Sequence, residues 1–120
     1  MSDNNLRVQP PIEILADENR LASALAARVV SAAAAAVAAR GRFALAIPGG
    51  SVVSLLARGL AAPLAAANWY VFWTDERRVP LSDPQSNFRL AETELLPKLA
   101  GAHVHPIRGS ATEYETELRP

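Results

Sequence analysis

The chain has 120 residues, with 12 lysines and arginines against 12 aspartates and glutamates, and it contains no cysteine. A chain of this length forms one small domain at most, since typical domains hold roughly 100–200 residues. The balanced charge argues against a basic nucleic-acid-binding surface and a polybasic membrane anchor. The absence of cysteine excludes a disulfide scaffold, a thiol nucleophile and a Cys-ligated zinc site.

The N-terminal segment predicts a flexible arm followed by a strand. Residues 1–11 are polar and end in two prolines, and they lack the basic-then-apolar order of a signal peptide. The cysteine-free composition fits a reducing compartment, and we expect the protein to be cytoplasmic. Residues 12–15 are apolar and partly β-branched, which is typical of an edge strand.

A long alanine-rich helix is predicted next. Asp17 has the residue type of an N-cap, and Gly41 that of a C-cap. Between them, apolar residues recur at steps of three and four and predict one buried face, formed by Leu21, Leu25, Val29 and Ala32. Residues 21–39 are long enough for a membrane span, but Arg28 and the many alanines favour a helix of a soluble protein.

The remaining elements alternate between strands and helices. Residues 43–47 form a continuous apolar run, which suits a parallel strand covered on both faces, and the aromatic residues 69–73 predict a second buried strand. Helical patterns cover residues 52–60 and about 87–96, and residues 104–107 suit a short strand. This order predicts the α/β class, with a doubly wound, mainly parallel sheet.

The C-terminal segment predicts the start of a further helix. Thr112 and Glu115 have the spacing of a capping box, but only about one helical turn follows before Pro120, and helices this short are not stable alone in water. We therefore expect residues 12–120 to be the N-terminal part of an α/β domain that is incomplete at its C-terminus.

A glycine turn is the first candidate site. The segment 48–51, Pro-Gly-Gly-Ser, lies between a predicted buried strand and a predicted helix. Glycine lets the backbone turn tightly and approach a ligand, and a helix N-terminus offers N–H groups and a positive dipole end to an anion. Gly49, Gly50 and Ser51 are therefore candidate phosphate ligands. The alternative is an ordinary strand-to-helix turn, since the segment is neither a Walker A loop nor a G-x-G-x-x-G fingerprint.

A charged triplet is the second candidate. Asp75, Glu76 and Arg77 follow the aromatic strand directly, and open α/β sheets bind ligands beyond the carboxyl ends of their strands. A carboxylate can orient a sugar hydroxyl, and an arginine can hold an oxyanion with its fork of donors. The alternative is a solvated loop with salt bridges.

The two histidines predict no metal site. His103 and His105 would share one face of a strand, but no H-E-x-x-H pattern and no nearby acid support a metal. We expect them to be surface residues, and we expect no metal site in this chain.

Two segments together resemble the 6-phosphogluconolactonases, which share a superfamily with the glucosamine-6-phosphate isomerases and deaminases. Residues 43–51 are similar to the strand and phosphate loop of that family. Residues 73–88 resemble its signature, an Asp-Glu-Arg triplet, a Val-Pro pair and an acidic loop that closes in Ser-Asn. The resemblance covers roughly residues 12–120. Arg77 favours the lactonase branch, because the deaminases typically carry tyrosine at that position.

The resemblance implies a Rossmann-like fold and a reaction. It implies hydrolysis of 6-phospho-D-glucono-1,5-lactone to 6-phospho-D-gluconate in the oxidative pentose phosphate pathway, with a small phosphosugar lactone as partner, no nucleic acid or membrane, and no cofactor. The oligomeric state stays open. Gly49, Gly50 and Ser51 would hold the phosphate. Arg77 would stabilise charge on the lactone, and Asp75 would orient sugar hydroxyls or the arginine. Pro48 stands where the family usually has serine or threonine, so one hydroxyl donor is missing.

The resemblance also implies a general base that these residues lack. The family's later glycine–aspartate–glycine–histidine segment supplies that histidine, and nothing in residues 1–120 matches it. The role is not transferred to His103. We therefore expect little or no lactonase activity from the chain alone. Two alternatives stay open at this point: an isomerase or deaminase acting on glucosamine 6-phosphate, and a phosphosugar-binding module without catalysis.

Overall fold

The computed structural model describes residues 17–109 and 111–119. The elements along the chain are α1 (Glu18–Arg40), β1 (Phe43–Ile47), α2 (Ser51–Gly59), β2 (Leu64–Ala65), β3 (Trp69–Trp73), α3 (Asn87–Glu94), the 3-10 turn η2 (Leu96–Lys98), β4 (Leu99–Ala100), β5 (His103–His105) and α4 (Ala111–Leu118). The predicted arm over residues 1–11 and the predicted edge strand over 12–15 lie outside the described residues.

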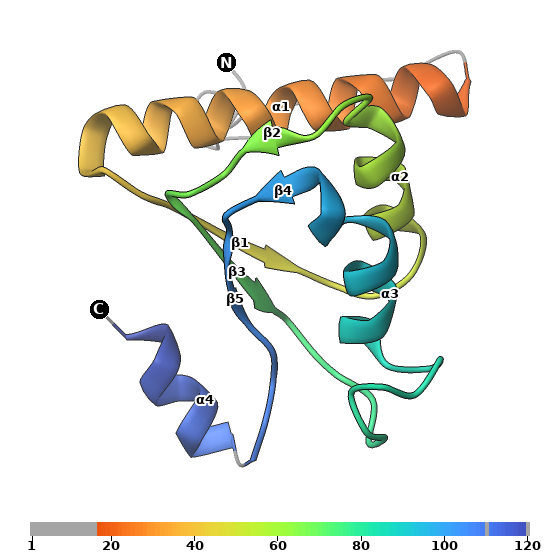
Figure 1. Cartoon of the computed structure of the whole chain (residues 1–120), viewed down its shortest axis with the longest axis vertical. Coiled ribbons are helices and arrows are strands. Elements are labelled where there is room, and N and C mark those ends of the chain that lie inside the picture. The colour runs from red at the N-terminus through yellow and green to blue at the C-terminus, as the bar shows by residue number, and fades with distance from the viewer. Residues whose placement is uncertain (1–16, 110, 120) are drawn as a thin grey trace, which may run out of the picture.

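The main sheet has three parallel strands in the order β1-β3-β5 (Figure 1). Phe43 pairs with Trp69 and Ile47 with Trp73, so the two apolar strands are in register over their whole length. A second parallel pair, β2 with β4, was not predicted. Parallel pairing needs crossover connections, which α2 and α3 supply. The predicted α/β class with a parallel sheet is confirmed.

Helices lie on both sides of this sheet, but they cover it unequally. α1 packs on β1 and α2, and Phe88 of α3 packs on Trp73, with ring centroids 5.3 Å apart. The side chains of Trp69, Val71 and Trp73 are therefore buried on this face. α4 lies on the other side of the strands (Figure 1), where the Tyr114 ring packs against that of Phe72.

The prediction that the strand over residues 43–47 is covered on both faces is wrong for the described residues, and the strand over 69–73, predicted to be buried, is fully buried on one face only. Ala44 and Ala46 of β1 are exposed, and Tyr70 and Phe72 of β3 are only half-buried. The reason is that α1, α2 and α3 all pack on the opposite face, so that α4 is the one described helix on this side. A hollow of about 330 Å³ remains between this face and the end of α4, lined by Arg42, Ala44, Tyr70, Phe72, His105, Leu118 and Arg119.

The caps of α1 were predicted correctly, but its buried face was not. The Asp17 side chain accepts a hydrogen bond from the Arg20 backbone, and Gly41 closes the helix in the left-handed conformation. The buried residues, however, are Ala22, Ala26, Ala33 and Ala36. Of the residues predicted to be buried, Leu21 is 42% exposed, Ala32 is exposed as well, and Leu25 and Val29 are partly buried against the core.

Close contact between two helices explains this alanine face. A β-carbon on Gly59 of α2 would overlap with the backbone oxygen of Ala22 and crowd the side chain of Ala26. Helices that approach so closely need small residues at the contact, so the larger leucines lie beside it. α1 is also long and apolar enough to cross a membrane by length and composition, with a mean hydropathy of 1.8. It packs on α2 and β1 through one face, on which Ala22, Ala26, Ala33 and Ala36 are buried.

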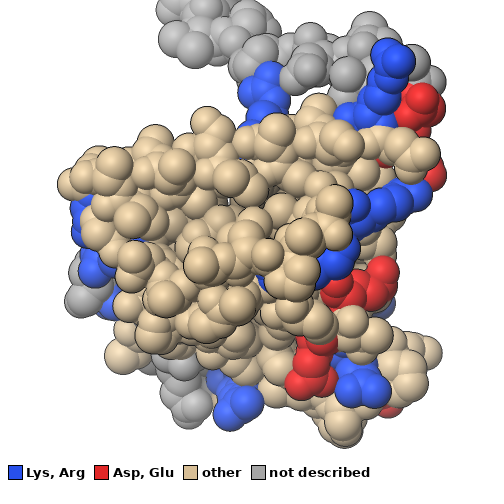
Figure 2. Space-filling view, turned by 45° about the horizontal axis from the view of Figure 1, so that its top comes forward, with Lys and Arg blue, Asp and Glu red and all other residues tan. Residues whose placement is uncertain are grey.

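The surface that includes the outer side of α1 carries few charges. Figure 2 shows a broad uncharged area facing the viewer, with acidic and basic side chains mostly at its margins. This agrees with the alanine-rich exposed side of α1.

Candidate active site

The carboxyl ends of β1 and β3 are joined directly. The Thr74 backbone N–H donates to the carbonyl oxygen of Ile47 at 2.9 Å, and the Thr74 hydroxyl donates to the same oxygen at 3.4 Å. The glycine turn after β1 and the charged loop after β3 therefore leave the sheet side by side. The expected placement of both segments at the tips of neighbouring strands is confirmed.

The glycine turn leads straight into α2. Gly50 is the N-cap of this helix, with φ of 77° and ψ of −151°, and no side chain caps the helix. Such a φ strongly favours glycine. The Val53 N–H donates to the Gly50 carbonyl oxygen at 3.2 Å, whereas the N–H groups of Ser51 and Val52 lie before the first hydrogen bond of the helix and can serve an anion. Ser51, the first helical residue, is exposed and can add its hydroxyl.

Glu76 has a role in the structure that the sequence did not reveal. Its carboxylate receives hydrogen bonds from the backbone N–H groups of Arg77 at 2.7 Å, Asn87 at 2.6 Å and Phe88 at 2.9 Å. The hydroxyl of Ser86 donates to it at 2.8 Å. An acidic side chain at a helix N-terminus is stabilised by the unpaired N–H groups and the helix dipole. Glu76 therefore caps α3 from the preceding loop.

These contacts change the acidity of Glu76. Partial burial is the largest single influence and acts to raise the pKa. The hydrogen bonds from Phe88, Arg77, Asn87 and Ser86 act together in the other direction, and the net effect is a pKa below the ordinary value of 4.5. The residue is therefore a structural carboxylate that stays ionised at neutral pH.

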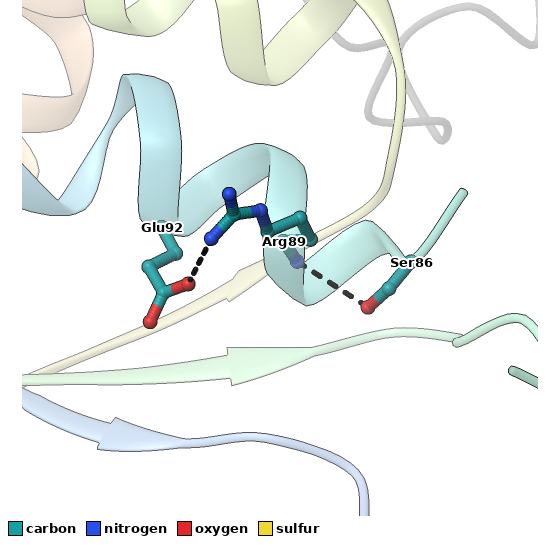
Figure 3. A network of polar contacts seen from close by, with 3 residues as sticks. All are labelled: Ser86, Arg89 and Glu92. Carbon is teal, nitrogen blue, oxygen red and sulfur yellow. Dashed lines mark hydrogen bonds and ion pairs between the residues drawn. The ribbon is translucent and has the colours of Figure 1, made fainter. Parts of the chain in front are cut away.

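The first turn of α3 is also stabilised by its own N-cap residue, Ser86. Figure 3 shows the Ser86 hydroxyl accepting a hydrogen bond from the Arg89 backbone, at 3.3 Å. The guanidinium of Arg89 pairs with the Glu92 carboxylate on the exposed side, at 3.2 Å. Ser86 is fully buried, so its single hydroxyl serves both the Glu76 carboxylate and the helix start.

Asp75 contacts the residue that follows β3 and the first residue of α3. Its Oδ1 atom lies 3.4 Å from the Thr74 hydroxyl and 3.4 Å from Nδ2 of Asn87. Asn87 also donates from Nδ2 to the backbone oxygen of Asp75, at 3.1 Å. The carboxylate itself is exposed, so it can accept from a ligand hydroxyl. The Ser-Asn pair was noted in the sequence as part of a family motif, and these contacts give Asn87 a role.

Arg77 is an exposed residue next to the Glu76 cap. Asn87 lies against the Gly49 backbone and donates to Asp75, so it joins the glycine turn to the loop after β3. Within residues 17–109 and 111–119, no hydrogen bond or ion pair joins Arg77 to Ser51. The convergence of these two side chains on one ligand stays a prediction.

The two histidines are part of an aromatic stack on the open face of the sheet. His103 stacks on Tyr70, with ring centroids 4.4 Å apart, and His105 stacks on Phe72, at 4.8 Å. His103 also contacts the backbone oxygen of Ala67 through Nε2, at 3.0 Å. Over residues 17–109 and 111–119, no group of three or more metal-ligating side chains is present.

Comparison with known families decides the classification. The family model described as glucosamine-6-phosphate isomerases/6-phosphogluconolactonase matches residues 16–120. The chain belongs to this family. The matched range includes the glycine turn, the Asp75–Arg77 loop and Asn87.

Individual family members agree with this classification. Human 6-phosphogluconolactonase is 36% identical over 123 residues, which cover 90% of this chain and 48% of the human one. The enzyme of Mycobacterium tuberculosis (strain ATCC 25618 / H37Rv) is 36% identical over 112 residues, which cover 89% of this chain and 45% of the other. The chain thus spans less than half the length of these curated relatives.

A solved structure shows the same fold. The crystal structure of a 6-phosphogluconolactonase from Shewanella baltica OS155 matches with a TM-score of 0.77 and 25% sequence identity. The match covers 87% of this chain and 48% of that one. The parallel α/β arrangement described above is therefore the arrangement of about half of such an enzyme.

Proposed function

We propose that this chain provides the phosphosugar-binding part of a 6-phosphogluconolactonase, which hydrolyses 6-phospho-D-glucono-1,5-lactone to 6-phospho-D-gluconate. The observation that carries the proposal is the pairing of β1 with β3, which brings a glycine turn and an acidic loop to one edge of the sheet. The family includes both reactions, but its curated members compared above are 6-phosphogluconolactonases. These relatives together with the arginine at position 77 support the lactonase reaction over amino-sugar deamination.

The phosphate would bind at the glycine turn. The backbone N–H groups at Gly50 and Ser51 and the hydroxyl of Ser51 suit its oxygens, and the positive end of the α2 dipole adds to the attraction. Binding the phosphate fixes the position of the sugar, so that the lactone carbonyl is held in place for attack.

The lactone end would lie toward the loop after β3. Water attacks the carbonyl carbon, the carbonyl oxygen becomes an oxyanion, and the ring C–O bond then breaks as a proton reaches the leaving oxygen. The guanidinium of Arg77 would stabilise the oxyanion, and the Asp75 carboxylate would orient the sugar hydroxyls. The general base that the family resemblance implies is a histidine outside the 120 residues, so we expect little turnover by this chain alone.

Calorimetric titration with stable ligands tests the binding proposal. We expect the chain to bind 6-phosphogluconate more tightly than gluconate, because only the former carries the phosphate. Arg77→Ala is expected to lower the 6-phosphogluconate affinity by about tenfold, since one charge-assisted hydrogen bond contributes about 1.5–3 kcal/mol. Arg78→Ala removes the same charge one residue further on and is the control. Equal affinity for both ligands would contradict the proposal.

A kinetic assay tests the expected lack of turnover. Lactone hydrolysis is followed at short times with a coupled dehydrogenase that consumes 6-phosphogluconate, against the spontaneous reaction without protein. Turnover near that of a complete lactonase would show that the base lies within the 120 residues.

A further inference from the structure

Asn87 lies where the two loops of the candidate site meet. It is the first residue of α3, and it is only 9% exposed. The proposed function assigns no ligand contact to this asparagine. A buried amide is costly unless its polar atoms have partners, so its contacts indicate what it does.

On one side, the amide of Asn87 contacts the loop after β3, which contains Asp75. Nδ2 donates to the backbone oxygen and to Oδ1 of Asp75, and Oδ1 is also the atom that the Thr74 hydroxyl contacts. Both side-chain contacts thus fall on the same carboxylate oxygen. The orientation of the carboxylate is fixed, and Oδ2 is left to accept from a ligand.

The same amide packs against the glycine turn on the other side. A β-carbon built on Gly49 would overlap with Oδ1 and Cγ of Asn87, so this side chain lies directly on the Gly49 backbone. Any other residue at position 49 would therefore require either the Asn87 side chain or the turn to move. One side chain therefore contacts both loops, and the Glu76 carboxylate anchors its backbone at 2.6 Å.

We infer that Asn87 is a positioning residue that sets the spacing between the phosphate-binding turn and the carboxylate of Asp75. The inference rests on the proposed function. A ligand with a phosphate at one end and hydroxyl groups at the other gains from both loops only when their separation matches its length. Inorganic phosphate uses the turn alone, so the spacing matters little to it.

The effect of one uncharged substitution on the binding of two ligands distinguishes a positioning role from a general effect on stability. Asn87→Ala removes both contacts without changing the net charge. We expect its affinity for 6-phosphogluconate to fall about tenfold, and its affinity for inorganic phosphate to change by less than about threefold. Asn68→Ala, at the exposed residue that precedes β3, is the matched control and should leave both affinities unchanged. Equal losses for both ligands, or no loss for either, would overturn the inference.

A measurement without ligand keeps this test independent of the proposed function. If the wild-type chain binds 6-phosphogluconate no better than gluconate, the proposed function fails, and hydrogen exchange then decides about Asn87. We expect Asn87→Ala to accelerate amide exchange at Val53, whose N–H donates to the Gly50 carbonyl oxygen of the turn. Exchange at Leu60, whose N–H donates to the Leu56 carbonyl oxygen at the other end of α2, should not change. Unchanged exchange at the turn would show that Asn87 does not hold it.

Discussion

The hydroxyl group of Tyr114 binds both polar backbone groups of Trp73. It accepts from the Trp73 N–H at 2.6 Å and lies 3.0 Å from the Trp73 carbonyl oxygen. β5 ends at His105 and is followed by Pro106, which has no N–H group to donate. A side chain from α4 thus takes the place of a strand partner at the end of β3.

Removal of this hydroxyl is expected to destabilise the fold. Tyr114→Phe leaves the N–H and carbonyl groups of Trp73 buried without their partner, and an unsatisfied buried group costs about 1–3 kcal/mol. Urea unfolding followed by tryptophan fluorescence measures the change. Tyr70→Phe, on the open face of the sheet, removes a hydroxyl for which no hydrogen bond is described, and should shift stability by less than about 0.5 kcal/mol. Equal effects of the two substitutions would contradict this role of Tyr114.

Glu76→Gln should destabilise the protein at neutral pH by about 1–2 kcal/mol, because the cap of α3 loses its charge. The effect should depend on pH in a defined direction. The pKa of Glu76 is lowered in the folded state, so the stabilisation is fully present above the ordinary value of 4.5. It is lost as the pH falls through the lowered folded value.

Unfolding free energies of both proteins between pH 3 and pH 7 test this, and the difference between them should shrink with acid. Glu92→Gln is the control, because its carboxylate is exposed and pairs only with Arg89. Exposed pairs contribute about 0–1 kcal/mol. A difference between wild type and Glu76→Gln that stays constant over this range would show that the charge is not what stabilises α3.

Gly59→Ala should weaken the contact between α1 and α2. Alanine is the better helix former by about 0.5–1 kcal/mol, but the new methyl group would overlap with the Ala22 backbone oxygen. Overpacking costs about 1–3 kcal/mol, so we expect a net loss and a lower melting temperature. Arg58→Ala, the neighbouring exposed position, loses only a surface ion pair with Glu18 and should cost less than about 1 kcal/mol. A stabilised Gly59→Ala variant would argue against close helix contact.

Gly50→Ala should disrupt the candidate phosphate site. The φ and ψ angles of Gly50 lie in a region that is almost restricted to glycine and costs other residues about 1–3 kcal/mol. The turn should then change shape, and the affinity for 6-phosphogluconate should fall about tenfold or more. Gly41→Ala replaces another glycine with positive φ at the opposite end of β1, and should leave binding unchanged. Titration of both variants with 6-phosphogluconate shows whether the turn binds the ligand.

The sequence predicted those elements whose signals are local. Continuous apolar runs marked β1 and β3, Asp17 marked the start of α1, and alternation of strands and helices gave the parallel class. The prediction of the buried face of α1 was wrong. Close contact with Gly59 requires small residues on the buried face, and the spacing of leucine and valine does not show which face of a helix contacts a neighbour. The pair β2–β4 was missed because two-residue strands carry no pattern.

The site was predicted only in part for a similar reason. Residue types and their place after strands identified the glycine turn, Asp75 and Arg77. Glu76 looked like another site residue, because nothing local shows that a carboxylate reaches the start of a helix ten residues later. Asn87 depends in the same way on two distant contacts, with Asp75 and with Gly49. Such roles come from tertiary packing and have no sequence period.

The parallel pairing of the main sheet has a consequence for the order of folding. No two of its strands are joined by a hairpin, so each pair can form only after a whole helix has crossed over. The glycine turn leaves the ribosome well before α3, and it stays without its neighbour until Asn87 arrives. On the proposed function, a phosphosugar would bind chains that have docked α3 more tightly than chains that have not, and its binding should stabilise the folded protein chiefly by slowing unfolding.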